Sequence, residues 1–197
     1  MKYQNKIWIF TLIIFSLLIS NLRAEDITEF GLENINIGDS LLKHFSKSFI
    51  EKKKRNIKVN KKKIKDYKNI YKDKNNNLYD RVVLYFKSSD PNLTITRIIG
   101  RKYFKKNINE CYNLQESIAN DLEKILLNPD RFVTGIKKLA KYPNGESYFK
   151  EIYFYIKNDS MIRIICYDYS KKDTRSKDRL SVIITSNEYS KWRKSVK

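Results

Sequence analysis

Histidine, glycine and cysteine are scarce in this chain of 197 residues, and their scarcity excludes several kinds of chemistry. One histidine, His44, and two widely separated cysteines do not supply the clustered ligands of a first-row metal site. Asp73, Asp80 and Asp90 lack the spacing of a calcium-binding loop. Five scattered glycines cannot form a loop that cradles phosphate groups. We therefore expect no metal and no cofactor.

Long apolar runs are also rare, and the longest lies at the N-terminus. Lys2 and Lys6 precede the apolar run Ile7 to Ile19, and the small residue Ala24 follows it closely. This order describes a secretory signal peptide. A run of about 13 residues falls short of the roughly 18–20 that span a membrane. We predict that residues 1–24 are a signal peptide and that the protein is periplasmic or secreted.

The remaining residues, 25–197, have the composition of a single folded domain without a transmembrane segment. Hydrophobic residues make up 41% of the sequence, which argues against disorder. The 41 lysines and arginines against 22 acidic residues give a net charge of +19, and the segment Lys47 to Lys74 is the most basic. Such charge fits an anionic partner. It also fits a low-GC genome, because the abundant Lys, Asn, Ile and Tyr have AT-rich codons.

The periodicity of apolar residues predicts an α+β fold with a mainly antiparallel sheet. Two helices are expected, beginning after Asp39 or Ser40 and after Asn107 or Asn109, and ending near Lys52 and Leu127. Alternating residues predict strands over 82–87, 93–104, 148–157, 161–169 and 180–185, and one or two weak strands within 57–70. Polar and turn-forming residues predict turns at 75–77 and 158–159 and a loop over 171–178. A short helix or tail is expected over 186–192. We expect both helices on one face, and the element order suggests two α-β-β-β halves.

The two cysteines are expected to form one disulfide. Cys111 lies on the apolar stripe of the second helix, and Cys166 alternates with Ile162 and Ile164 in a predicted strand. Both sulfur atoms therefore belong to one helix–sheet interface, and an exported chain favours oxidation. Facing elements bring Cα atoms within bonding distance only at close contacts, so a pair of buried free thiols is the alternative.

Gly38-Asp39-Ser40-Leu41 resembles the signature of the GDSL lipase and esterase family. The resemblance implies that Ser40 is a nucleophile, which requires a histidine base and oxyanion donors. His44 lies four residues later on the same predicted helix, and the family's Asp-x-x-His block and middle Gly and Asn blocks are missing. The same residues also resemble helix starts in small outer-membrane assembly lipoproteins and β-lactamase-inhibitor-like domains, where Ser or Asp caps the helix.

The whole chain resembles a group of small exported proteins of unknown function from AT-rich marine bacteria. The resemblance rests on three motifs, Ile37 to Leu42, Asn107 to Tyr112 and Ile165 to Asp168. It implies export and no activity. We therefore expect a non-enzymatic binding or envelope interaction module, with no catalytic residue. The alternatives are a GDSL-type serine hydrolase and a module that binds anions, polysaccharide or nucleic acid.

One surface could carry such binding. If the apolar side of the strands faces the helices, the other side of the sheet is basic and aromatic. Aromatic rings with cations can hold sugars, anionic polymers or single-stranded nucleic acid, although tyrosine also simply favours strands. An anionic polymer or another envelope protein is the expected partner. The predicted anion-binding face comprises Arg81, Tyr85, Lys87, Tyr153, Tyr155, Arg163 and Tyr167.

Overall fold

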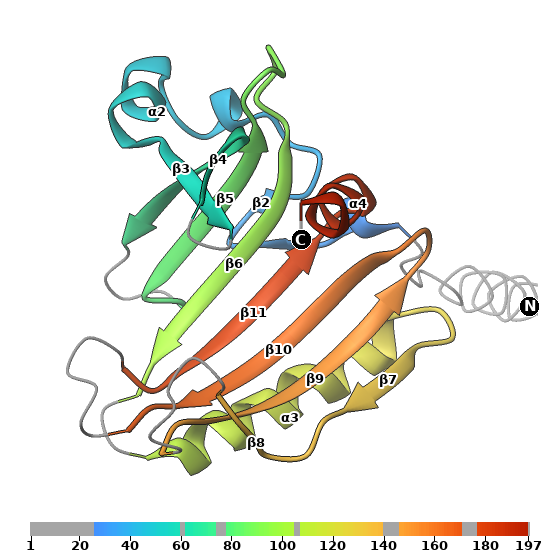
Figure 1. Cartoon of the computed structure of the whole chain (residues 1–197). Coiled ribbons are helices and arrows are strands. Elements are labelled where there is room, and N and C mark those ends of the chain that lie inside the picture. Colours follow the sequence, from blue (N-terminus) through green and yellow to red (C-terminus); the bar gives the residue numbers. More distant parts are fainter. Residues whose placement is uncertain are drawn as a thin grey trace, which may run out of the picture.

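The computed structural model describes residues 26–59, 62–73, 78–104, 107–139, 146–170 and 177–196 (Figure 1). The expected signal peptide, residues 1–24, lies outside the described residues. So do the expected turn at 75–77 and most of the expected loop over 171–178. Among the described residues, no helix is long and apolar enough to cross a membrane.

One antiparallel sheet dominates the described part of the chain, which confirms the α+β class and the mainly antiparallel pairing. Its spatial order is β3-β4-β5-β6-β11-β10-β9-β7, and β8 also pairs with β9. The strands are β3 (Arg55–Val59), β4 (Lys62–Asp73), β5 (Arg81–Lys87), β6 (Ile95–Tyr103), β7 (Asp130–Val133), β8 (Lys137–Lys138), β9 (Tyr148–Ile156), β10 (Ser160–Asp168) and β11 (Arg179–Thr185).

Alternation along the strands gives the sheet two different faces. On the face that we call the α3 face, Leu84, Ile98 and Ile184 lie opposite one another in neighbouring strands. These residues belong to the main buried core. The other face, which we call the α4 face, carries the residues between them in sequence, beginning with Arg81, Val83 and Tyr85 of β5.

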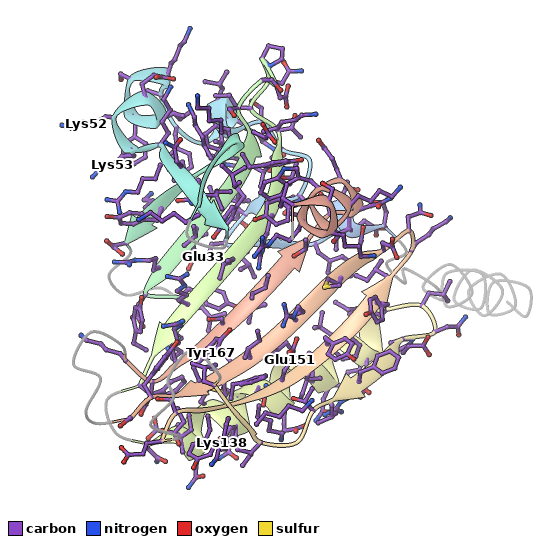
Figure 2. All side chains as sticks on the ribbon, viewed as in Figure 1. Glu33, Lys52, Lys53, Lys138, Glu151 and Tyr167 are labelled. Carbon is purple, nitrogen blue, oxygen red and sulfur yellow. A yellow bond between two sulfur atoms is a disulfide. The ribbon has the colours of Figure 1, made fainter. Side chains whose placement is uncertain are left out.

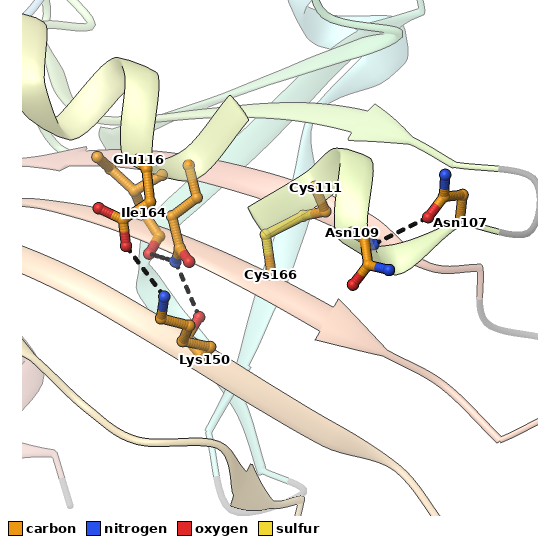
Figure 3. Close-up of a disulfide and its surroundings, with 8 residues drawn as sticks. Asn107, Asn109, Cys111, Glu116, Lys150, Ile164 and Cys166 are labelled. Atoms are coloured by element: carbon orange, nitrogen blue, oxygen red, sulfur yellow. Dashed lines mark hydrogen bonds and ion pairs between the residues drawn. A yellow bond between two sulfur atoms is a disulfide. The ribbon is translucent and has the colours of Figure 1, made fainter. Parts of the chain in front are cut away.

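Helix α3 (Ile108–Ile125) packs against β10 and β11 and covers one half of the α3 face (Figure 1). Asn107 caps the helix by accepting a hydrogen bond from the Asn109 N–H. Cys111 and Cys166 form a disulfide between the helix and β10, with their Cα atoms 5.9 Å apart (Figure 3). The expected bond is therefore present, and it ties the first turn of α3 to the middle of the sheet.

The other half of the α3 face is covered by the N-terminal segment. A 3-10 helix, η1 (Ile27–Glu29), leads into a separate ribbon of β1 (Gly31–Leu32) and β2 (Ile35–Asn36). Close packing here depends on Gly100 of β6, since a Cβ atom at this position would lie 2.7 Å from the Tyr79 ring and 2.8 Å from Leu32. The segment supplies five side chains to the main core, those of Ile27, Phe30, Leu32, Ile35 and Ile37.

The single helix expected over 40–52 is wrong. Ser40 caps only the 3-10 helix η2 (Leu41–Lys43), and Ser46 then caps the seven-residue α2 (Lys47–Lys53). Ser46 Oγ accepts a hydrogen bond from the Phe49 N–H, so it starts a new helix in the middle of the apolar stripe. The apolar periodicity correctly identifies residues that face the main core, because both η2 and α2 bury a residue there. It does not reveal that a second cap divides the segment into two helices.

The arrangement of two helices on one face is not confirmed, because the first expected helix is present only as η2 and the short α2. A further helix, α4 (Asn187–Ser195), packs on the face opposite α3. Tyr189 of α4 contacts Tyr67 and Tyr85, which both lie on the α4 face. The two α-β-β-β halves are not confirmed either. Four strands of the large sheet, β3 to β6, follow α2, and β7 and β8 precede β9 after α3.

Candidate functional site

The residues around Ser40 form the cap of a short helix. Ser40 Oγ donates to the Asn92 carbonyl oxygen at 2.6 Å and accepts from the Leu42 N–H. His44 Nε2 lies 3.0 Å from Asp39 Oδ2, so Asp39, not Ser40, is the hydrogen-bond partner of the imidazole. Hydrogen bonds lower the pKa of the Asp39 carboxyl to about 2, and the bond from the Asn36 N–H has the largest effect. Within the GDSL letters, Ser40 thus begins the 3-10 helix η2.

The α4 face brings together all seven residues of the predicted anion-binding face. The β-sheet register places six of them in four rows that cross the strands, with side chains of one row directly opposite one another, and Lys87 lies opposite Tyr67 of β4. Figure 2 shows Tyr167 and Glu151 on this side of the sheet. The rows are Tyr85-Arg97-Thr185-Met161-Tyr155; Tyr71-Val83-Ile99-Ile183-Arg163-Tyr153-Phe132; Arg81-Arg101-Ser181-Ile165-Glu151; and Tyr103-Arg179-Tyr167-Phe149.

The floor of the α4 face is aliphatic. Val83, Ile99, Ile165 and Ile183 are all buried, although α3 lies on the other side of the sheet. Aromatic side chains pack against this floor, those of Tyr71, Tyr85, Phe149 and Tyr167. The face therefore carries aromatic rings and arginine side chains around a buried aliphatic floor.

Several predicted residues are occupied by contacts within the protein. The Arg163 guanidinium forms an ion pair with the buried Glu151, and Lys87 Nζ lies 3.6 Å from Glu188 of α4. Tyr85 is covered by Tyr189, with ring centroids 5.6 Å apart. These residues share the face, but their charges or rings are already engaged.

A cluster of three arginines occupies the other end of the face. Arg101 lies directly opposite Arg81 of β5 and diagonally from Arg179 of β11. Directly opposite residues have Cβ atoms about 5 Å apart, and diagonal neighbours have them about 7–8 Å apart. Arg81 is paired with Asp73, whereas Arg101 and Arg179 have no ion pair within the part of the chain that the structure describes. We call these three residues the arginine cluster.

Tyrosine rings surround the arginine cluster. The Arg81 guanidinium lies 4.7 Å from the centroid of the Tyr71 ring, and that of Arg179 lies 4.7 Å from Tyr167 and 5.0 Å from Tyr169. The nearby carboxylates of Asp80 and Asp178 accept backbone N–H groups of Tyr103 and Tyr169. The cluster therefore presents cations on an aromatic support.

An aromatic cluster lies at the far edge of the same face, on β7 and β9. Phe132 and Tyr153 stack with centroids 5.1 Å apart, and Tyr155 meets both rings edge-on. Phe132 is 42% exposed and Tyr155 49% exposed. We call these three residues the aromatic cluster.

Arg101, Arg179 and Phe132 were not anticipated from the sequence. Arg97, Ile99 and Arg101 alternate with Ile98 and Gly100 in the predicted strand 93–104, so the period-two rule would have placed both arginines on the α4 face. The same rule applied to residues 179–185 would have added Arg179. No comparable signal existed for Phe132, because the four-residue β7 was not predicted.

Other features of the described chain are less suited to a ligand. A cavity of about 280 Å³ opens at the opposite end of the sheet, but Asp26, Lys157 and Glu188 line it with charges of both signs. No group of three or more potential metal ligands occurs among the described residues. Comparisons with protein families, with curated proteins and with solved structures find no match to this chain.

Proposed function

We propose that this chain is an exported, non-enzymatic binding protein of the cell envelope that holds an anionic partner on its α4 face. The observation that carries the proposal is the pair Arg101 and Arg179, two guanidinium groups on adjacent strands with no carboxylate partner within the described residues. Arginine presents a planar set of donors that matches carboxylate, sulfate and phosphate groups.

The electrostatics of the cluster support this proposal. Like charges directly opposite each other in a sheet are destabilising, and Arg81 faces Arg101 in this way. Asp73 pairs with Arg81, whereas Arg101 and Arg179 have no ion pair among the described residues. An oxyanion bound between Arg101 and Arg179 would remove the remaining repulsion, so binding would relieve a cost that the free protein carries.

Two further observations support an exported binding protein. Disulfides persist in oxidising compartments, and the Cys111–Cys166 bond fits such a location. Ser40 Oγ donates to a backbone carbonyl and the His44 imidazole is bonded to Asp39, which favours binding over the alternative of a GDSL-type hydrolase. The basic stretch around Lys52 and Lys53 offers a competing, diffuse explanation for any affinity toward anions.

Matched double variants separate the arginine cluster from diffuse charge. Arg101→Gln with Arg179→Gln and Lys52→Gln with Lys53→Gln each remove two positive charges, and the lysines are exposed residues of α2 outside the arginine cluster (Figure 2 labels both). We expect the arginine variant to bind heparin about tenfold more weakly than the wild type, and the lysine variant to change affinity less than twofold. Isothermal titration calorimetry gives both values. Equal losses, or no binding by the wild type, would overturn the proposal.

A further inference from the structure

The α4 face has two chemically different binding zones joined by a neutral strip. The arginine cluster occupies β5, β6 and β11, and the aromatic cluster occupies β7 and β9. Three strand spacings, about 14 Å, separate β6 from β9. A ligand that touches both clusters must therefore be an extended chain of several units.

The strip between the clusters carries no net charge. Its polar groups are Ser181 and the ion pair of Arg163 with Glu151, and its floor is Ile165 and Ile183. Because Glu151 already pairs with Arg163, the strip offers no unpaired cation for a second acidic group. A polymer whose charged units are separated by neutral units matches a surface with one cationic zone and an uncharged strip beside it.

The aromatic cluster also favours neutral rings. Phe132 and Tyr153 stack against each other with an interplanar angle of 11°, and Tyr155 closes one side of the pair at 78° to Phe132. The cluster thus forms a compact apolar surface, with Phe132 and Tyr155 both substantially exposed. The C–H faces of a sugar can lie flat on such a surface, and the ion-paired strip offers hydrogen-bond partners for hydroxyl groups.

We infer that the ligand is an acidic polysaccharide in which neutral sugars separate the acidic ones. An acidic group binds Arg101 and Arg179, and a neutral sugar packs on Phe132 and Tyr155. This inference rests on the proposed anion-binding function and adds the class of polymer and the second contact zone.

The test uses soluble gellan fragments, in which neutral sugars separate the glucuronates, and oligothymidylate, which carries a phosphate on every nucleotide. Phe132→Ala with Tyr155→Ala should weaken gellan binding roughly tenfold and change oligothymidylate binding less than twofold. Leu42→Ala, an exposed apolar side chain on η2, is the matched control and should leave both affinities unchanged. Circular dichroism verifies that each variant is folded.

The outcomes distinguish this inference from the proposed function. Unchanged gellan binding in the aromatic variant, with a loss in Arg101→Gln/Arg179→Gln, would overturn the aromatic zone and leave the anion site standing. A loss with oligothymidylate that equals or exceeds the loss with gellan would overturn the polysaccharide and favour single-stranded nucleic acid. If the wild type bound heparin but neither of these polymers, the polysaccharide inference would fail and the anion site would stand; if it did not bind heparin either, the proposed function itself would fail.

Discussion

The carboxylate of Asp39 holds together the chain segment around it. Its oxygens accept the Asn36 N–H at 3.0 Å and lie 3.0 Å from Lys43 Nζ and His44 Nε2. These contacts favour the charged form and hold the pKa at about 2, below the ordinary value of 3.8. Asp39 thereby joins β2 to η2 and fixes the chain just before Ser40.

The lowered pKa of Asp39 predicts a specific loss of stability in acid. A group with a depressed folded-state pKa contributes stability above its unfolded pKa and loses it as the pH falls through the folded value. The free energy of unfolding should therefore fall between about pH 4 and pH 2, and Asp39→Asn should flatten this part of the profile. Urea titrations at several pH values measure the effect. Asp121→Asn, on the exposed side of α3, controls for the loss of one charge, and identical profiles for Asp39→Asn and the wild type would refute the prediction.

Side-chain directions could be predicted from the sequence better than side-chain partners. Period-two alternation correctly separated Tyr85 and Arg163 from the core, because a strand offers only two faces. It could not indicate that Glu151 neutralises Arg163 or that Tyr189 covers Tyr85, since both contacts depend on which strands and helices meet. The choice among candidate arginines therefore had to come from the fold.

At the scale of elements, the contact between α3 and β10 was the most predictable feature. Cys111 shares the helix stripe with residues that face the sheet, and Cys166 lies on the facing side of β10. Gln115, one turn further on, is fully buried and donates to the carbonyl oxygens of Lys150 and Ile164 (Figure 3). The disulfide and this amide together fix the helix on the sheet.

Removal of the disulfide should lower stability substantially. The bond closes a loop with a sequence separation of 55, for which the chain-entropy model gives an upper value of about 4 kcal/mol. Cys111→Ala with Cys166→Ala should therefore lower the free energy of unfolding by about 2–4 kcal/mol, as measured by urea denaturation. Reductant should destabilise the wild type and leave the double variant unchanged. A wild type that is insensitive to reductant would contradict the prediction.

Short elements could not be predicted from the sequence for physical reasons. Strand β7 has four residues and no alternation strong enough to stand out, and it is a strand because it pairs with β9. The break between η2 and α2 depends on Ser46 at a position that the apolar stripe also tolerates. Helix α4 has a recognisable cap in Ser186, but the face on which it packs is decided by Tyr67 and Tyr85.

At the scale of the whole molecule, the two faces of the sheet differ in how they are covered. The α3 face is closed by α3 and the N-terminal segment, whereas the α4 face is covered by a helix at one end only. The part of the α4 face that the helix does not cover carries arginines and tyrosines around a small aliphatic cluster. Substitutions in the arginine cluster should therefore affect ligand binding more than folding.

Export is tested on the intact protein. Expression in a bacterium with the native leader should yield periplasmic protein whose first residue is Glu25 or a close neighbour, because signal peptidase cuts after small residues. N-terminal sequencing of the periplasmic fraction identifies that residue. Recovery of the protein in the cytosol with Met1 intact would contradict the proposed location.

The salt dependence of heparin binding tests the central claim, that the arginine cluster is the anion site. Each cation in contact with the polymer releases counterions, so the slope of log affinity against log salt reports the number of contacts. The slope of Arg101→Gln/Arg179→Gln should be shallower than that of the wild type by about two, while Lys52→Gln/Lys53→Gln should keep the wild-type slope. Equal slopes for the two variants would show that diffuse charge, and not the arginine cluster, binds the anion.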